Sequence, residues 1–278
     1  MIPENITTED GLKLHTRHWQ IENPKAVVVI AHGLGEHIGR YEHVTAAFNG
    51  ADYAAVGLDH RAHGKNEGLP RVFVTDIDLF VNDLYLLWQA VRVTYPDKPI
   101  FLLGHSMGGN IAVRFTLRHQ NEIQGLVTTD AFLIADEAIP AAVVRLGKAV
   151  AQIAPGIPLT RVNSAELSHD PAVCHAYDAD PLVFHERVRA GMAAALLRSG
   201  ADALSRAHML TIPILVLHGE SDVVSTVRAS QLLHGNAGSA DKTLHIYPGM
   251  YHEILNEIEN GRVLADIIDW LNRHLPRT

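Results

Sequence analysis

The sequence predicts an α/β fold in which a mostly parallel central sheet is flanked by helices and interrupted by an inserted helical segment. Three observations support this prediction. Apolar runs of strand length alternate with amphipathic stretches of helical length, which is typical of parallel sheets whose strands are joined by helices. Residues 130–211 contain no buried strand, although a usual crossover needs only about 10–30 residues. A serine flanked by glycines lies where one apolar run meets a helical stretch.

Length and composition limit the kind of protein this is. A chain of 278 residues has room for one large α/β domain with a subdomain, and its net charge of −8 argues against nucleic-acid binding. The single cysteine, Cys174, excludes an internal disulfide and suits a reducing compartment. Residues 1–10 lack the apolar segment of a secretory signal, and no apolar run is long enough to cross a bilayer. We therefore expect a cytoplasmic protein whose only membrane contact is peripheral.

The first elements follow from apolar periodicity. Residues 12–19 alternate between two faces, which predicts an antiparallel strand at the edge of the sheet. Residues 26–31 and 53–58 are continuous apolar runs, which predict strands buried on both faces. A helix is expected over 41–49 between them. Residues 77–95 predict a long helix, because apolar residues recur along one side of it.

The second half divides into sheet and insertion. In chain order, the remaining elements of the sheet domain are strands at 100–103, 124–129, 214–217 and 243–247 and helices at 111–119 and 262–275. Between the second and third of these strands, helical stretches near 139–153 and 184–197 are interrupted by prolines. We therefore expect a core formed by residues 1–132 and 205–278, with a helical cap, or lid, formed by 133–204.

The glycine-flanked serine is the candidate nucleophile. Residues 100–110 read I-F-L-L-G-H-S-M-G-G-N, a buried strand, a sharp turn and the start of a helix. This context fits the nucleophile elbow G-x-S-x-G, in which Gly104 and Gly108 leave room for a strained turn that presents Ser106. The alternative is a glycine-rich turn that contains a serine by chance.

A serine nucleophile needs a base, and the base needs an orienting acid. Asp222 follows the predicted strand 214–217, and His252 follows the predicted strand 243–247, so both are expected at the carboxyl edge of the sheet. The order serine, aspartate, histidine is that of the nucleophile-elbow hydrolases. Glu220 and Asp241 are rivals for the acid, but the extra loop residues favour Asp222.

The negative oxygen formed during acyl transfer needs two backbone N–H donors. The residue after the nucleophile, Met107, supplies one. The glycine loop H-G-L-G-E-H at 32–37 is expected to supply the other, and we assign it to Leu34, with Gly35 as the alternative.

These stretches resemble the monoacylglycerol lipase branch of the α/β-hydrolases over nearly the whole chain. The matching segments are H-G-L-G-E-H-I-G-R-Y (32–41), D-H-R-A-H-G (59–64), G-H-S-M-G-G (104–109), Y-D-A-D-P-L (177–182), H-G-E-S-D (218–222) and D-K-T-L-H-I-Y-P-G-M-Y-H (241–252). The resemblance implies the α/β-hydrolase fold, with Ser106, Asp222 and His252 as the triad. It also implies that Arg40, His105 and Tyr177 help to hold a glycerol head group.

The function implied by the resemblance is hydrolysis of a monoacylglycerol to a free fatty acid and glycerol through an acyl-enzyme intermediate. A broad carboxylesterase or a lysophospholipase stays open as an alternative, as does a ligand-binding protein that uses the fold without turnover. An aminopeptidase would need an acidic pair for the substrate amine, and none is obvious in the cap. Dehalogenases and epoxide hydrolases need an aspartate in place of Ser106.

No metal or cofactor is predicted. His60 and His63, or His32 and His37, are spaced for ligands only weakly, and no helical carboxylate–histidine motif accompanies them. The glycines of residues 33–39 lack the G-x-G-x-x-G register of a dinucleotide loop.

The expected partner is a small lipid ester. The apolar stretch 139–153 carries few charges, so it either packs on the core or forms an exposed apolar lip that touches membranes transiently and admits acyl chains. The sequence indicates no particular oligomeric state.

Overall fold

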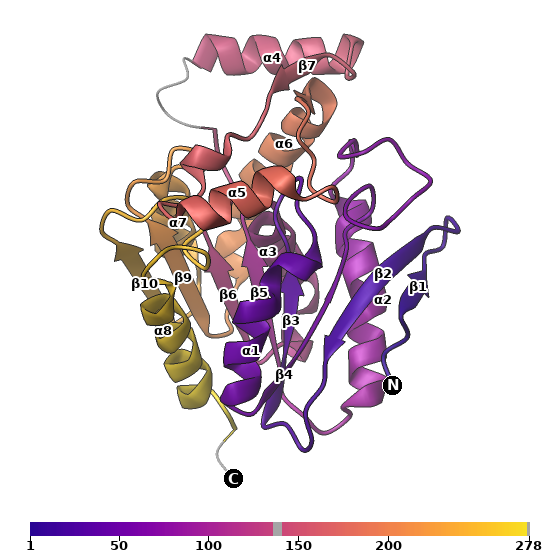
Figure 1. Ribbon diagram of the computed structural model, residues 1–278. Helices are drawn as coiled ribbons and strands as arrows, with labels where there is room; N and C mark the ends of the chain where they lie inside the picture. Colours follow the sequence, from indigo (N-terminus) through magenta and orange to yellow (C-terminus); the bar gives the residue numbers. More distant parts are fainter. Residues whose placement is uncertain (136–140, 277–278) are drawn as a thin grey trace.

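The computed structural model describes residues 1–135 and 141–276, and its centre is an eight-stranded sheet (Figure 1). The strand order is β1-β2-β4-β3-β5-β6-β9-β10. The strands are β1 (Asn5–Thr7), β2 (Lys13–Trp19), β3 (Ala26–Ala31), β4 (Tyr53–Leu58), β5 (Ile100–His105), β6 (Gly125–Thr129), β9 (Ile214–Gly219) and β10 (Lys242–Tyr247). All pairs from β4 to β10 are parallel, while β1 and β2 are antiparallel to their neighbours. The predicted fold class is confirmed.

Helices cover both faces of this sheet (Figure 1). They are α1 (Glu42–Gly50), α2 (Asp78–Thr94), α3 (Met107–His119), α4 (Ala141–Ile153), α5 (Pro171–Ala179), α6 (Ala190–Arg206), α7 (Val227–Asn236) and α8 (Asn260–Arg273). Short 3₁₀ turns are η1 (Ile38–Tyr41), η2 (Gln120–Glu122), η3 (Ser164–Glu166) and η4 (Ala207–Met209).

The strand alternation explains why the central strands are apolar throughout. In β3, Val27 and Val29 pack in the cluster that contains residues of α2, α3 and α7, whereas Val28 and Ile30 pack in the cluster that contains residues of α1 and α8. Successive side chains of a strand point to opposite faces, so a strand covered on both faces needs apolar residues at every position. This packing fixes the carboxyl ends of β3, β5, β6, β9 and β10 at one edge of the sheet.

Three sequence expectations need correction. The strand predicted at the edge, β2, is covered by β1, which is too short and too polar to show a periodic signal. The helix predicted over 184–197 begins only at Ala190, because β8 (Val188–Arg189) pairs with β7 (Pro158–Thr160) instead. Helix α3 begins at Met107, directly after Ser106, and not at 111. The helix predicted over 139–153 is observed from Ala141, and residues 139–140 lie outside the described ranges.

Helices α5 and α7 are absent from the sequence prediction. Helix α7 buries only Ala229, Ser230 and Leu233, too few apolar residues to produce a helical stripe.

Between β6 and β9 the chain leaves the sheet over residues 130–213. Helix α4 lies across the top of the molecule, α5 lies in front, and α6 leads back down toward the sheet (Figure 1). No helix among the described residues combines the length and apolar character needed to span a membrane.

Helix α6 is bonded directly to the core helix α3. The amide of Asn110 in α3 donates to the carbonyl of Leu196 at 3.2 Å and accepts from the hydroxyl of Ser199 at 2.5 Å. A Cβ at Gly200 would lie 2.0 Å from the carbonyl oxygen of Leu133, so α6 is also in close contact with the segment that follows β6. The main packing partner of α4, in contrast, is α6 itself.

Candidate active site

Ser106 sits on a strained turn between β5 and α3. Its φ of +53° and ψ of −116° are unusual for a residue with a side chain. The flanking glycines allow this turn, because a Cβ at Gly108 would lie 2.0 Å from the carbonyl oxygen of Ala31 and one at Gly104 would lie 2.3 Å from that of Gly108. The local sequence therefore specifies a tight strand–turn–helix with the serine at its apex.

The structure brings the three predicted side chains together. His252 Nε2 lies 3.0 Å from Ser106 Oγ, and His252 Nδ1 lies 2.7 Å from Asp222 Oδ2. The other oxygen of Asp222 accepts from two backbone N–H groups, those of Val224 at 2.7 Å and Ser225 at 2.9 Å. These bonds hold the carboxylate in place, so the imidazole is oriented with one nitrogen facing the serine.

The two rivals for the acid lie elsewhere. Glu220 accepts from the backbone N–H of Gly249 at 3.2 Å, and Asp241 pairs with His274 at 2.9 Å.

The charges of this site reinforce one another. Burial alone would lower the pKa of His252, but the charge and hydrogen bond of Asp222 outweigh it and raise that pKa above its usual 6.5. Burial would likewise raise the pKa of Asp222, but His252 and His218 lower it below its usual range. The pair therefore favours an ionised aspartate and stabilises an imidazolium when one forms.

A pH dependence follows from these shifts. A general base acts as neutral imidazole, so a reaction that uses this site should slow about tenfold per pH unit below the pKa of His252. Because that pKa is raised, the decline should begin at a pH above 6.5. A pH profile of kcat/KM measures it directly. Activity that stays constant down to pH ~5 would exclude His252 as the base.

Above Ser106 lies a cavity of about 510 Å³ whose lining is mostly apolar and includes residues of α4, α6 and β7. Leu34 and Met107, the two predicted backbone donors, line it beside Ser106 and His252. The glycine loop is in contact with the serine here, since a Cβ at Gly33 would lie 3.4 Å from that of Ser106. The volume is that of a typical small-ligand site.

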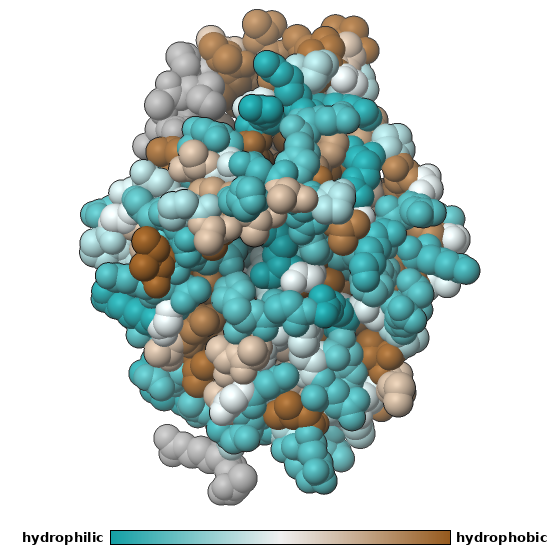
Figure 2. Space-filling view, viewed as in Figure 1, coloured by the Kyte–Doolittle hydropathy of each residue, from teal (hydrophilic) through white to brown (hydrophobic). Residues whose placement is uncertain are grey.

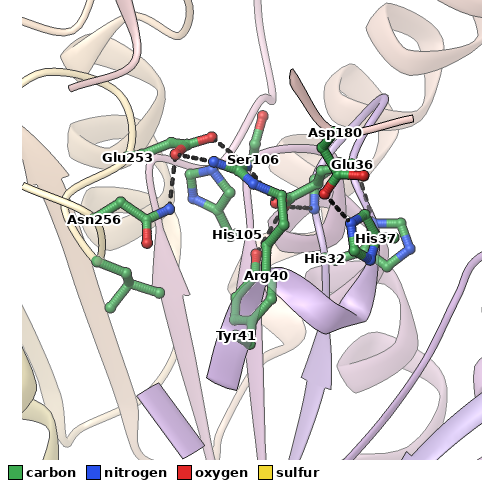
Figure 3. A network of polar contacts seen from close by, with 12 residues as sticks. His32, Glu36, His37, Arg40, Tyr41, His105, Ser106, Asp180, Glu253 and Asn256 are labelled. Atoms are coloured by element: carbon green, nitrogen blue, oxygen red, sulfur yellow. Dashed lines mark hydrogen bonds and ion pairs between the residues drawn. The ribbon is translucent and has the colours of Figure 1, made fainter. Parts of the chain in front are cut away.

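A buried charge network surrounds Arg40 (Figure 3), and its two acids, Glu36 and Glu253, line the cavity. Both terminal nitrogens of Arg40 donate to the carboxylate of Glu253, at 2.6 and 2.8 Å, and one also donates to Glu36 at 2.8 Å. Glu36 accepts further from the hydroxyl of Tyr41 at 2.8 Å, and Glu253 accepts from the amide of Asn256 at 2.7 Å. Burial alone would raise the pKa of Glu36, but the charge of Arg40 outweighs it and lowers that pKa to about 2.

The three residues expected at a glycerol head group differ in position. His105 and Tyr177 line the cavity, whereas Arg40 is absent from its lining and reaches it through Glu36, Glu253 and the ring of Tyr177, 4.9 Å from its guanidinium carbon. The hydroxyl of Tyr177 is buried without a hydrogen-bond partner among the described residues. Burial lowers the pKa of His105 to about 4, so its ring is neutral at pH 7.

Glu36 and Glu253 did not emerge from the sequence reasoning. Glu36 lies in the glycine loop, and Glu253 directly follows His252, so each is close in sequence to a predicted site residue. That adjacency was the available signal, but no pattern indicated that Arg40 would join them.

Three of the four histidines considered as metal ligands, His32, His60 and His63, are fully buried, and the rings of His60 and His63 contact Phe80. The fourth, His37, pairs with Asp180 at 2.8 Å. The Nε2 of His32 accepts from the backbone N–H of His60 at 2.9 Å, and the Nδ1 of His63 lies 2.9 Å from the carbonyl of Arg61. Their closest ring centroids are 4.3 Å apart, as in packed side chains. The groups found with metal-compatible spacing among the described residues do not include them.

These histidines should make stability sensitive to acid. Burial lowers the pKa of His60 well below 6.5 and that of His63 to about 3, so both stay neutral in the folded chain at pH values where the unfolded chain binds protons. Folding stability should therefore fall as pH drops below ~6.5, by about 1.4 kcal/mol per pH unit for each such histidine.

Urea unfolding between pH 7.5 and 5 tests this. In a His60→Leu variant, the unfolding free energy should change with pH by about 1.4 kcal/mol per pH unit less than in the native protein. His175→Leu, at an exposed position, should show the native pH dependence. Equal slopes in both variants would contradict the account.

Comparison with known proteins gives the family. Residues 22–259 match the family described as serine aminopeptidase, S33. The chain belongs to this family. Among curated relatives of this monoacylglycerol lipase-like α/β-hydrolase, a monoacylglycerol lipase of Mycolicibacterium smegmatis is 40% identical over 253 residues, covering 91% of this chain and 90% of that protein. A monoglyceride lipase of Rattus norvegicus is 32% identical, covering 98% and 90%.

A solved structure extends the comparison. The monoacylglycerol lipase of Paleococcus ferrophilus aligns with this monoacylglycerol lipase-like α/β-hydrolase at a TM-score of 0.82 and 28% identity, covering 94% of this chain and 99% of that one. The chain is therefore a carboxylic ester hydrolase of the monoacylglycerol lipase-like kind.

Proposed function

We propose that this protein hydrolyses monoacylglycerols to a free fatty acid and glycerol, with Ser106, His252 and Asp222 as its catalytic triad. The observation that carries the proposal is the hydrogen-bonded chain from Ser106 Oγ through His252 to Asp222, opening into a largely apolar cavity. The monoacylglycerol lipases similar to this chain over nearly its whole length support the choice of substrate.

The reaction has two steps, formation of the acyl-enzyme and its hydrolysis. His252 takes the proton of Ser106 as its oxygen attacks the acyl carbonyl, and Asp222 stabilises the imidazolium. The backbone N–H groups of Leu34 and Met107 are proposed to hold the negative oxygen of the tetrahedral intermediate. Glycerol leaves with the proton from His252. A water activated by the same imidazole then releases the fatty acid.

The cavity lining offers both polar and apolar groups, as the two parts of a monoacylglycerol require. Among the polar residues that line the cavity are His105 and Tyr177, and the buried hydroxyl of Tyr177 has no hydrogen-bond partner among the described residues. Arg40 is proposed to act on the head group through Glu253 and Tyr177, which it contacts. The apolar walls suit an acyl chain.

We further propose that residues 133–204 act as a cap over Ser106 and that α4 touches lipid surfaces. Figure 2 shows apolar residues gathered over the top of the molecule, where α4 lies. Leu146 and Ile153 of α4 are exposed at 65% and 88%, and neither belongs to the cavity lining. A helix with such a face binds at the lipid–water interface without spanning the bilayer.

Substrate profiling tests the proposal. Monoacylglycerols, a diacylglycerol, a lysophospholipid, p-nitrophenyl esters and an aminoacyl p-nitroanilide should be compared as substrates. We expect monoacylglycerols to give the highest kcat/KM. Equal rates on simple esters would reduce the assignment to a broad carboxylesterase. Preference for the anilide would favour an aminopeptidase, in which Glu36 and Glu253, two acids of the cavity lining that share the single charge of Arg40, would face the substrate amine.

Acyl-chain selectivity should depend on Gly147 of α4. This glycine lines the cavity, and a Cβ added there meets nothing within 4 Å. A Gly147→Leu variant should place its side chain in the path of a long chain and lower kcat/KM for a palmitoyl ester roughly tenfold relative to an octanoyl ester. The matched control is Gly156→Leu, where space is also open but the residue is outside the cavity lining. The same selectivity in both variants would remove Gly147 from the acyl path.

A further inference from the structure

Asp130 is a buried carboxyl group beside the proposed triad. It directly follows β6, is fully buried, and has a φ of +49°, which is unusual for a residue other than glycine. Its Oδ1 accepts from the backbone N–H of Gly219 at 2.8 Å. Its Oδ2 is buried and has no hydrogen-bond partner among the described residues. A buried polar atom without a partner normally has an explanation in function or strain.

Asp130 lies close to both Asp222 and His252. One oxygen of Asp130, one of Asp222 and a ring nitrogen of His252 all lie within 4.8 Å of one another. His218 also faces both acids, with its Nε2 3.2 Å from Asp222 and 3.9 Å from Asp130. The spacing of the first three groups would suit a metal ion. However, both nitrogens of His252 are engaged, by Ser106 and Asp222, which leaves none for a cation.

Two carboxyl groups this close in a buried site do not both ionise readily. Asp222 is the acid that bonds His252 directly, and it also accepts from two backbone N–H groups. Burial, followed by the charge of Asp222, raises the pKa of Asp130 well above its usual value, and the charge of Glu253 adds to this effect. Asp130 therefore keeps its proton while Asp222 carries the charge.

We propose that Asp130 is a reserve acid of the triad, able to orient and stabilise His252 when Asp222 is lost. The proposal rests on the triad assignment made above. Without the carboxylate of Asp222, its repulsion no longer adds to the effect of burial on Asp130, and a protonated His252 nearby favours the ionised carboxyl, so Asp130 releases its proton to water. Its free Oδ2 has no hydrogen bond to give up, so it can turn toward the vacated side of His252 and stabilise the imidazolium.

A double-mutant cycle tests this inference. A triad without a working acid loses about 10⁴-fold in kcat. We expect Asp222→Ala to lose only about 10²-fold, and Asp130→Asn added to it to bring the loss to about 10⁴-fold. Asp130→Asn in the otherwise native chain should cost less than about tenfold, so its effect should depend strongly on the presence of Asp222.

The pH profile distinguishes an electrostatic role from a structural one. In Asp222→Ala the acid limb should remain close to its native position, because a carboxylate still stabilises the imidazolium. In the double variant that limb should move to lower pH. Added formate should restore part of the activity of the double variant, which also shows that the double variant is folded.

Several outcomes would overturn the inference. The first is that Asp222→Ala and the double variant have equal activities, both about 10⁴-fold below native. An acid limb that does not move between the two is another. If Asp222→Ala fails to fold, Asp222→Ser serves in its place, because it also vacates the side of His252 that Asp130 would occupy. Activity that survives in Ser106→Ala would instead overturn the proposed function, so the two failures are distinguishable.

Discussion

Replacing Ser106 by alanine should lower kcat for a monoacylglycerol roughly 10⁶-fold, since a serine triad acts as a unit and loses nearly everything with its nucleophile. The acyl-enzyme cannot form without Oγ, although the cavity and the proposed backbone donors are left intact. Among the described residues, the only side-chain hydrogen-bond partner of Ser106 Oγ is His252, so the substitution removes no other polar contact of this side chain. Fatty-acid release measured over hours would quantify the loss.

The control for this variant is binding. Ser106→Ala should still bind a non-hydrolysable monoacylglycerol ether, and it should no longer react with a fluorophosphonate that labels the native protein. Hydrolysis within tenfold of the native rate would show that another group is the nucleophile.

Arg40→Met should destabilise the fold by about 3–5 kcal/mol, because it leaves two buried carboxylates, Glu36 and Glu253, without their shared cation. Only 11% of the Arg40 side chain and 5% of each partner are exposed, so water cannot replace the lost partner. The midpoint of urea unfolding at pH 7.5 measures this change.

Arg118→Met is the matched control. This arginine also pairs with a carboxylate, Asp78, at 2.6 Å, but 31% of its side chain and 38% of its partner's are exposed. A surface pair of this kind contributes about 0–1 kcal/mol. Similar losses in the two variants would mean that burial of the Arg40 network does not determine its contribution.

The sequence predicts those parts of the fold that repeat with a period. The runs at 26–31 and 53–58 match β3 and β4 residue for residue, because burial on both faces requires continuous apolar sequence. Helix α7 and strand β1 bury too few apolar residues to produce such a signal. Residues 184–189 leave the predicted helix because β8 forms a long-range pair with β7.

The candidate site divides in the same way. Ser106, Asp222 and His252 are predictable because each follows a recognisable strand, and parallel strands present their carboxyl ends at one edge. Asp130 occupies an equivalent place after β6, yet its relation to Asp222 depends on a distance across the sheet that no local pattern encodes. The same holds for Arg40, whose partner Glu253 is separated from it by 213 positions.

The unequal attachment of the two helices that line the cavity has an evolutionary consequence. Helix α6 is hydrogen-bonded to the core through Asn110 and Ser199, so substitutions there disturb the fold as well as the cavity. Helix α4 packs mainly against α6, and its residues Val143, Val144 and Gly147 line the cavity. A lineage could therefore change α4 almost freely without losing a foldable protein. Divergence in substrate range among descendants of this chain should accumulate in α4 first, while α6 and the residues beneath it stay nearly constant.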